Sequence, residues 1–335
     1  MRGDYNEPGA NIFAAFGLRP CGGTRRGVRG YSASDGDIYR LRDAAQDTFF
    51  WRSRIELAHR VKERLAGSGS PAVDRFRQAS RGEPFVSDGG RLYVAERVVN
   101  MPCADFSDPG QFLRVVMAVA ETHAAMTWVS FGDELDYDTI RPSADIYASA
   151  VGAISRMAKI ARSRPSMSDF DAVFMRGRAR LLERLDEWIA SAEYLNADEI
   201  ERKASLSGYI SHNALKDETV LISANAVAIV DFLSCARGHF AGDLAGIIAR
   251  HFRQASHPLS PEAILLTYSS RNPLTADDIA MVALRMRYPE RFLRTALTYY
   301  EKKRVFTPAA LLSRIETIAA EQNSFDEYIE GFGKL

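Results

Sequence analysis

The hydrophobic pattern of this chain changes about one third of the way along it. Before residue 100, short alternating segments lie around two turns, Ser34-Asp35-Gly36 and Asp88-Gly89-Gly90. The alternating segments are residues 26–32, 37–42, 83–86 and 91–98. An Asp-Gly pair between alternating segments favours a β-hairpin. With helices expected over 11–18 and 48–66, the first hundred residues predict a small antiparallel sheet that carries a helix.

After Asp108 the apolar residues recur at helical spacing. Helices are expected over 111–126, 140–163, 169–193, 240–252, 260–268, 275–287, 289–301 and from 308 toward the C-terminus. The helical run is interrupted at 209–232, where two apolar strands, 220–223 and 227–230, flank Ala224-Asn225. The sequence therefore predicts an α+β protein with an N-terminal sheet lobe, 1–100, and a helical lobe, 101–335. The boundary is expected near Asn100 to Cys103.

Composition and charge narrow the classes of partner. The chain has 43 basic and 43 acidic residues, so no overall field draws it to nucleic acid or to an anionic membrane. Its three cysteines form no C-x-x-C pair, which favours a reducing compartment. Neither a signal peptide nor an apolar run of membrane-spanning length is recognised. We expect a cytoplasmic protein with no nucleic-acid partner and no membrane insertion.

The stretch from Ser211 to Ala245 carries the most specific signal. It reads SHNALKDETVLISANAVAIVDFLSCARGHFAGDLA. It resembles the H-G-D-x-x-x-x-N-x-L, I-D-F and D-L-A text of the kinase-like, aminoglycoside phosphotransferase-like superfamily. The residues in register are His212, Leu221, Val230-Asp231-Phe232, Gly238 and Asp243-Leu244-Ala245. This resemblance implies a two-lobed protein-kinase-like fold.

The same stretch departs from the superfamily where phosphate transfer needs it. Ala214 stands where the resemblance expects the catalytic aspartate, and Thr219 stands where it expects a metal-binding asparagine. Loss of the base alone should cost about a hundred- to ten-thousand-fold in rate. The resemblance makes the retained Asp231 a metal ligand, and gives His212 and Asp243 supporting roles in the catalytic loop.

The expected sheet lobe also departs from the pattern of the superfamily. Arg42 falls where the resemblance expects a phosphate-binding lysine, and its planar guanidinium is no simple substitute for an ammonium group. The best candidate for its helix partner is Glu56, which also fits an ordinary surface charge. Gly22, Gly23 and Thr24 occupy the place of a phosphate-covering loop, although a glycine pair in a hairpin is more often only a turn.

The C-terminal text points to one branch of the superfamily. Tyr288-Pro289-Glu290, then Phe292, the pair Tyr299-Tyr300 and a closing helix resemble the tail of CotS-type spore coat proteins, and the degenerate loop resembles their YutH-like members. This resemblance implies assembly in the mother-cell cytoplasm, deposition on the spore coat, and other spore coat proteins as partners.

Three functions stay open from the sequence. The first is a structural pseudokinase of the spore coat, for which no cofactor is expected. The second is a small-molecule phosphotransferase that uses ATP and Mg²⁺, with Asp217 as an unusual base and the Thr219 hydroxyl as a weak metal ligand. The third is a nucleotide-binding switch that relies on the retained Asp231.

Overall fold

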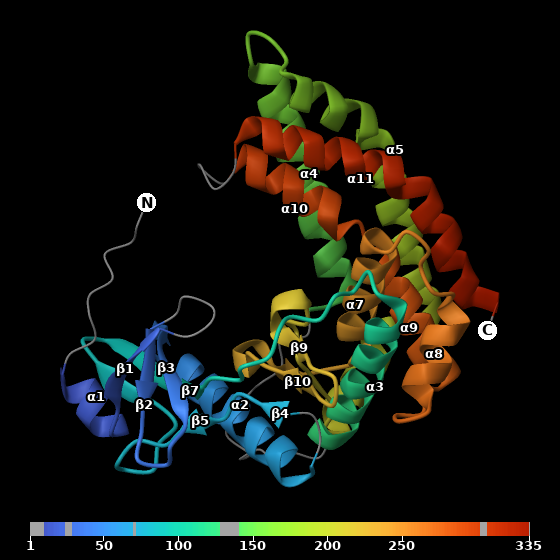
Figure 1. Ribbon diagram of the computed structural model, residues 1–335. Helices are drawn as coiled ribbons and strands as arrows, with labels where there is room; N and C mark the ends of the chain where they lie inside the picture. Colours follow the sequence, from blue (N-terminus) through green and yellow to red (C-terminus); the bar gives the residue numbers. More distant parts are fainter. Residues whose placement is uncertain (1–9, 24–28, 70–71, 128–140, 302–306, 335) are drawn as a thin grey trace.

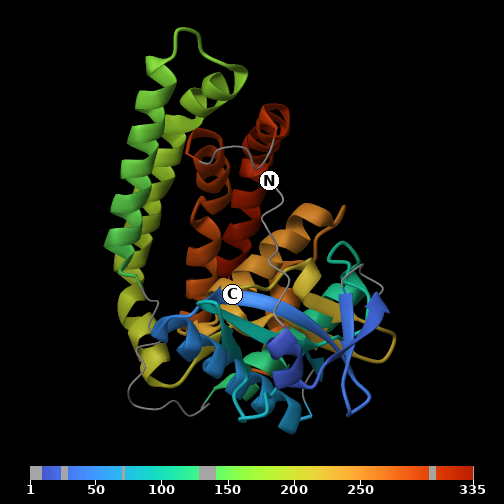
Figure 2. The same ribbon diagram turned by 90° about the vertical axis from the view of Figure 1, so that its left-hand side faces the viewer.

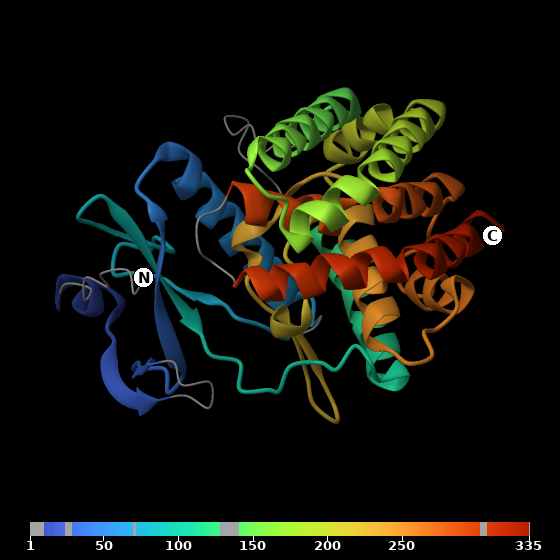
Figure 3. The ribbon, with the colours of Figure 1, turned by 90° about the horizontal axis from the view of Figure 1, so that it is seen from above.

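The computed structural model describes residues 10–23, 29–69, 72–127, 141–301 and 307–334. A sheet lobe lies on one side and a mainly helical lobe on the other (Figures 1 and 3). The expected α+β class is confirmed. The expected division near Asn100 to Cys103 falls in the segment that joins the last strand of the sheet lobe to the first helix of the helical lobe.

The N-terminal sheet is antiparallel, with the order β1-β2-β3-β7-β5 and with β6 paired to β7. Its strands are β1 (Arg19–Gly23), β2 (Arg29–Ser32), β3 (Ile38–Gln46), β5 (Phe76–Arg77), β6 (Val86–Asp88) and β7 (Arg91–Arg97). Both expected hairpins form, as β2 with β3 and as β6 with β7. Strand β1 was not predicted, because its Pro20 and paired glycines are typical of a turn.

Helix α2 (Phe49–Gly67) joins the two lobes. It begins after Thr48, whose hydroxyl accepts the Trp51 amide, and a short helix, α1 (Ala10–Phe16), precedes the sheet. The buried face of α2 belongs to the same hydrophobic core as the helical lobe. Strand β4 (Ala72–Val73) follows α2 and pairs in parallel with β10 (Val227–Ile229) of the helical lobe. The segment from α2 to β4 is therefore held by the second lobe.

The helical lobe is built on long antiparallel helices. Its helices are α3 (Pro109–Met126), α4 (Ser143–Ser163), α5 (Asp169–Leu195), α6 (Ala197–Leu206), α7 (Ala241–Gln254), α8 (Pro261–Ser269), α9 (Ala276–Arg287), α10 (Glu290–Tyr300) and α11 (Pro308–Glu330). Figure 2 shows α4 and α5 standing as a pair beside α10 and α11. Helix α6 was not predicted; it starts directly after Asn196, whose left-handed backbone, φ 56°, ends α5. Across the described ranges, no helix is both long and apolar enough to cross a membrane.

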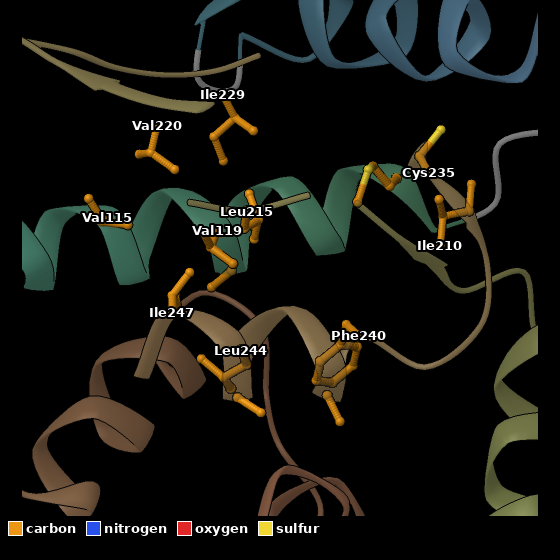
Figure 4. Packing of buried hydrophobic residues seen from close by; sticks show 14 of the residues in the cluster. Val115, Val119, Ile210, Leu215, Val220, Ile229, Cys235, Phe240, Leu244 and Ile247 are labelled. Atoms are coloured by element: carbon orange, nitrogen blue, oxygen red, sulfur yellow. The ribbon is translucent and has the colours of Figure 1, made fainter. Parts of the chain in front are cut away.

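The main core lies around α3 and α7. Val115 and Val119 of α3 face Val220 of β9 (Val220–Ile222) on one side and Leu244 and Ile247 of α7 on the other (Figure 4). All five side chains are fully buried. This packing fixes the strand pair β9–β10 and the start of α7, which carry the residues of the candidate site.

Candidate functional site

A carboxylate at the start of α7 holds the catalytic-loop-like segment. Asp243 accepts the backbone amides of His212 at 2.5 Å and of Asn213 at 2.8 Å, and its Oδ2 lies 3.2 Å from Nε2 of His123. Burial alone would raise the pKa of Asp243, but the bond with His123 and the nearby imidazoles lower it. Asp243 is therefore an ionised brace that joins α3, α7 and the loop.

His212 connects the loop to the end of β10. The Ala214 amide donates to its Nδ1 at 3.2 Å, and its Nε2 lies 3.1 Å from the carbonyl oxygen of Val230. This pattern requires the proton on Nε2, which donates to the carbonyl. Burial lowers the pKa of His212, so the ring is neutral at pH 7. His212 acts here as a fully buried structural link.

The base position carries no acid, and the expected weak metal ligand is engaged elsewhere. Ala214 supplies only a methyl group. The buried Thr219 hydroxyl donates to the carbonyl oxygen of Ala214 at 2.8 Å and accepts the Lys216 amide at 2.9 Å. The carboxylate of Asp217 accepts from Gln254 at 2.7 Å and lies 3.9 Å from Arg250, so it contacts the end of α7.

Arg42 of β3 binds the retained aspartate directly. Its Nη1 lies 2.7 Å from Oδ1 of Asp231 and 3.6 Å from Oε1 of Glu96, on the neighbouring strand β7. Burial would raise the pKa of Asp231, whereas the bond and charge of Arg42 lower it. The expected ion pair of Arg42 with Glu56 is corrected, because the partners of Arg42 are Asp231 and Glu96. A cofactor-binding role for Glu56 stays a prediction.

A buried group of charges continues behind this pair. Lys62 of α2 is fully buried, with its Nζ 3.0 Å from Oδ1 of Asp74 and 3.7 Å from Oε1 of Glu96. Arg40 binds Glu96 at 2.6 Å, and Asp74 accepts the Asp231 amide at 3.1 Å. We call this group the interlobe ion network. Its three cations and three carboxylates are Arg40, Arg42, Lys62, Asp74, Glu96 and Asp231.

One feature of the sequence, a lysine on an apolar helix face, could have predicted a buried ion pair here. Lys62 lies four residues after Ala58 and three before Leu65, on the buried face of α2. A lysine on an apolar helix face needs a buried partner, because an unpaired buried charge is very costly. The partners themselves, Asp74 and Glu96, could not be selected from spacing.

Both residues expected to hold Mg²⁺ make contacts within the chain. Asp231 is paired with Arg42, and Thr219 is bonded to backbone atoms. Within the described segments, no group of three or more His, Cys, Asp or Glu side chains could hold a metal ion. Gly22 and Gly23 end strand β1, and Thr24, the third residue of the expected phosphate loop, lies outside the described residues.

Comparison with known proteins identifies the fold. No protein-family model and no curated protein sequence matches this chain. Among solved structures, an aminoglycoside phosphotransferase from Alicyclobacillus acidocaldarius matches with a TM-score of 0.76 and 16% identity, covering 95% of this chain and 91% of that one. A spectinomycin phosphotransferase solved with ADP and spectinomycin matches with a TM-score of 0.58 and 11% identity, over 95% and 93%. A Plasmodium vivax ethanolamine kinase matches at 0.54 and 12%, over 90% and 80%.

These likenesses establish the fold of the chain. The chain has the kinase-like fold of the aminoglycoside phosphotransferases, as its catalytic-loop text predicted. At these identities the likeness extends to the fold alone. The described geometry brings His212, Ala214, Asp243, Asp231 and Arg42 together where the two lobes meet.

Proposed function

We propose that this protein is a catalytically inactive kinase-fold protein that acts through contacts with other proteins. The observation that carries the proposal is the 2.7 Å ion pair between Arg42 and Asp231. In a phosphotransferase of this fold the aspartate would hold a metal ion beside the phosphates. Here a guanidinium group of the chain itself neutralises that carboxylate.

Two further departures act in the same direction. Ala214 cannot accept the proton of an acceptor hydroxyl, and the Thr219 hydroxyl already donates to a backbone carbonyl. Positioning and charge neutralisation by metal provide most of the rate of phosphoryl transfer, so each loss adds to the barrier. We therefore expect no bound ATP or Mg²⁺ as a working cofactor.

We further propose that the protein is a CotS-type component of the spore coat, made in the mother-cell cytoplasm, with other spore coat proteins as partners. Support comes from the resemblance of its C-terminal text. In the fold, the double tyrosine of that text joins α10 to the start of α5: Tyr300 donates to Asp171 at 2.7 Å, and Tyr299 stacks on Phe170 at 3.9 Å between centroids. These tyrosines stabilise the lobe.

A small-molecule phosphotransferase is the second candidate, and the fold likeness over 95% of the chain favours it. The spectinomycin phosphotransferase was solved with ADP, so nucleotide binding is possible on this fold. For this chain to do the same, Arg42 would have to leave Asp231. Asp217 would also have to leave Gln254 to serve as the base.

Thermal unfolding with ATP, with and without Mg²⁺, separates the two candidates. A ligand that binds only the folded state raises its stability in proportion to the logarithm of concentration over Kd. We expect no shift that depends on Mg²⁺. A Mg²⁺-dependent shift that is lost in Asp231→Ala would favour the phosphotransferase.

A further inference from the structure

A large cavity lies in the helical lobe, apart from the interlobe ion network. Its volume is about 810 Å³, and Asn213, Ala214 and Lys216 of the loop line it together with residues of α7, α9, α10 and α11. Figure 1 shows these helices gathered in the helical lobe. The volume is that of a small-molecule site.

The lining of this cavity carries an excess of positive charge. Among the described residues, nine basic side chains and four carboxylates line it. Three of the basic side chains pair with carboxylates beyond the lining: Arg184 with Asp326, Lys216 with Glu218, and Arg250 with Asp217. Each carboxylate already has a partner: Asp243 holds the loop amides, and the other three bind arginines. Those pairs are Glu201 with Arg285, Glu290 with Arg294, and Glu321 with Arg291.

Four of these arginines come from two of the helices that line the cavity. Arg250 and Arg253 come from α7, and Arg291 and Arg294 from α10. We call these four residues the arginine cluster. Arg250 lies 3.9 Å from Asp217, and Arg291 lies 3.1 Å from Glu321.

Arg253 is the least compensated member of the cluster. Burial and the charges of Arg291, Arg250 and Arg294 together lower its pKa to about 9, and Glu321 acts in the opposite direction. Burial lowers the pKa of Arg314 on α11, and the charges of the same arginines add to that shift. At neutral pH Arg253 is still charged, so the cluster holds like charges close together in a partly buried place. A bound anion would relieve this repulsion.

We propose that this cavity binds a small molecule carrying two or more phosphate groups. Guanidinium groups match phosphate oxygens with paired, charge-assisted hydrogen bonds. Arginines from two helices that line one cavity can contact two phosphates of one ligand at once. The site is independent of the proposed loss of phosphate transfer, because it uses neither Asp231 nor a metal ion.

Calorimetric titration with sodium pyrophosphate in metal-free buffer tests this site. The wild type should bind, and binding should weaken as sodium chloride screens the cluster. Arg253→Gln and Arg291→Gln should each weaken binding by about tenfold or more, as expected for loss of a charge-assisted hydrogen bond. Arg253→Lys keeps the charge without the fork and should lose less.

A matched control variant tests where pyrophosphate binds. Arg202→Gln removes an exposed arginine of α6 outside the cavity, paired with Glu199, and should leave binding unchanged. The proposal is overturned if the wild type does not bind pyrophosphate, if Arg253→Gln binds like the wild type, or if Arg202→Gln loses binding as Arg253→Gln does. Preferential binding of spermidine, a cation, would equally overturn it.

Discussion

The interlobe ion network and the arginine cluster are both groups of partly or fully buried charge, but they differ in their balance. In the network, three cations meet three carboxylates, and Lys62 and Glu96 are almost entirely removed from water. In the cluster, four arginines meet three carboxylates, Asp217, Glu290 and Glu321, and burial together with neighbouring arginines lowers the pKa of Arg253.

The difference indicates two uses of charge. The charges of the network balance one another, so its residues serve the junction between the lobes. An unbalanced cluster is left with a positive potential that an anion can satisfy. Removal of Glu96, the carboxylate that three cations share, should therefore destabilise the first region, whereas removal of one arginine should leave the second unharmed or more stable.

The largest expected effect is in the network. Glu96→Gln removes the carboxylate that Arg40, Arg42 and Lys62 share, and leaves buried cations without it. Breaking a buried pair in this way costs about 3 to 5 kcal/mol of unfolding free energy. Urea unfolding measures it.

The matched control for that variant is Glu63→Gln, which removes the carboxylate of a surface ion pair on α2. Glu63 pairs with Arg75 at the surface, with more than a third of each side chain exposed. Such a pair contributes about 0 to 1 kcal/mol. Equal losses in Glu63→Gln and Glu96→Gln would contradict the view that the network is a buried structural unit.

A pH dependence should come next in size. Burial raises the pKa of Asp74 to about 6, with Lys62 opposing and Glu96 adding to the shift. A carboxyl group whose pKa is higher in the folded state than in the unfolded state stabilises the fold most when it is protonated, below its unfolded pKa. That contribution to stability is lost as pH rises through the folded pKa of about 6. Relative to Asp74→Asn, the wild type should lose about 2 to 3 kcal/mol between pH 4 and pH 7.

Stability curves of both proteins across that range provide the measurement. The difference between Asp74→Asn and the wild type should grow in favour of the variant as pH rises. A difference that is constant with pH, or that grows as pH falls, would show that Asp74 is held ionised by Lys62 instead.

The smallest expected effect is in the arginine cluster, and it has the opposite sign. Arg253→Gln removes one of several like charges, so the free energy of unfolding should rise by about 0.5 to 1 kcal/mol at low ionic strength. The gain should shrink as salt is added. A loss of stability above about 1 kcal/mol would show that Arg253 is a structural cation like Lys62.

Local patterns predicted much of the fold. The Asp-Gly turns located both hairpins, and the helical periodicity located α3, α5 and α7 to within a few residues. Strand β1 and helix α6 were missed because neither has a sustained apolar pattern: β1 contains proline and glycine, and α6 follows α5 after a single residue. Short edge elements depend on pairing with the rest of the fold, which local propensity does not include.

The site could be predicted only in part. Register with the catalytic-loop text located His212, Ala214 and Asp231. It could not reveal that Arg42 binds Asp231, because 189 residues separate them and only the packed lobes bring them together. The arginine cluster had no sequence signal either, since its members are spread over two helices that are distant in the chain.

ATP turnover tests whether the kinase-like site is inactive because Arg42 neutralises Asp231 and Ala214 provides no base. The wild type is assayed with Mg²⁺ and a panel of hydroxylated small molecules, beside Asp231→Ala as the blank. We predict the same background rate of ATP turnover for both proteins, because Arg42 forms an ion pair with the Asp231 carboxylate and Ala214 provides no base. Turnover by the wild type that requires Mg²⁺ and disappears in Asp231→Ala would show that the protein is an active phosphotransferase.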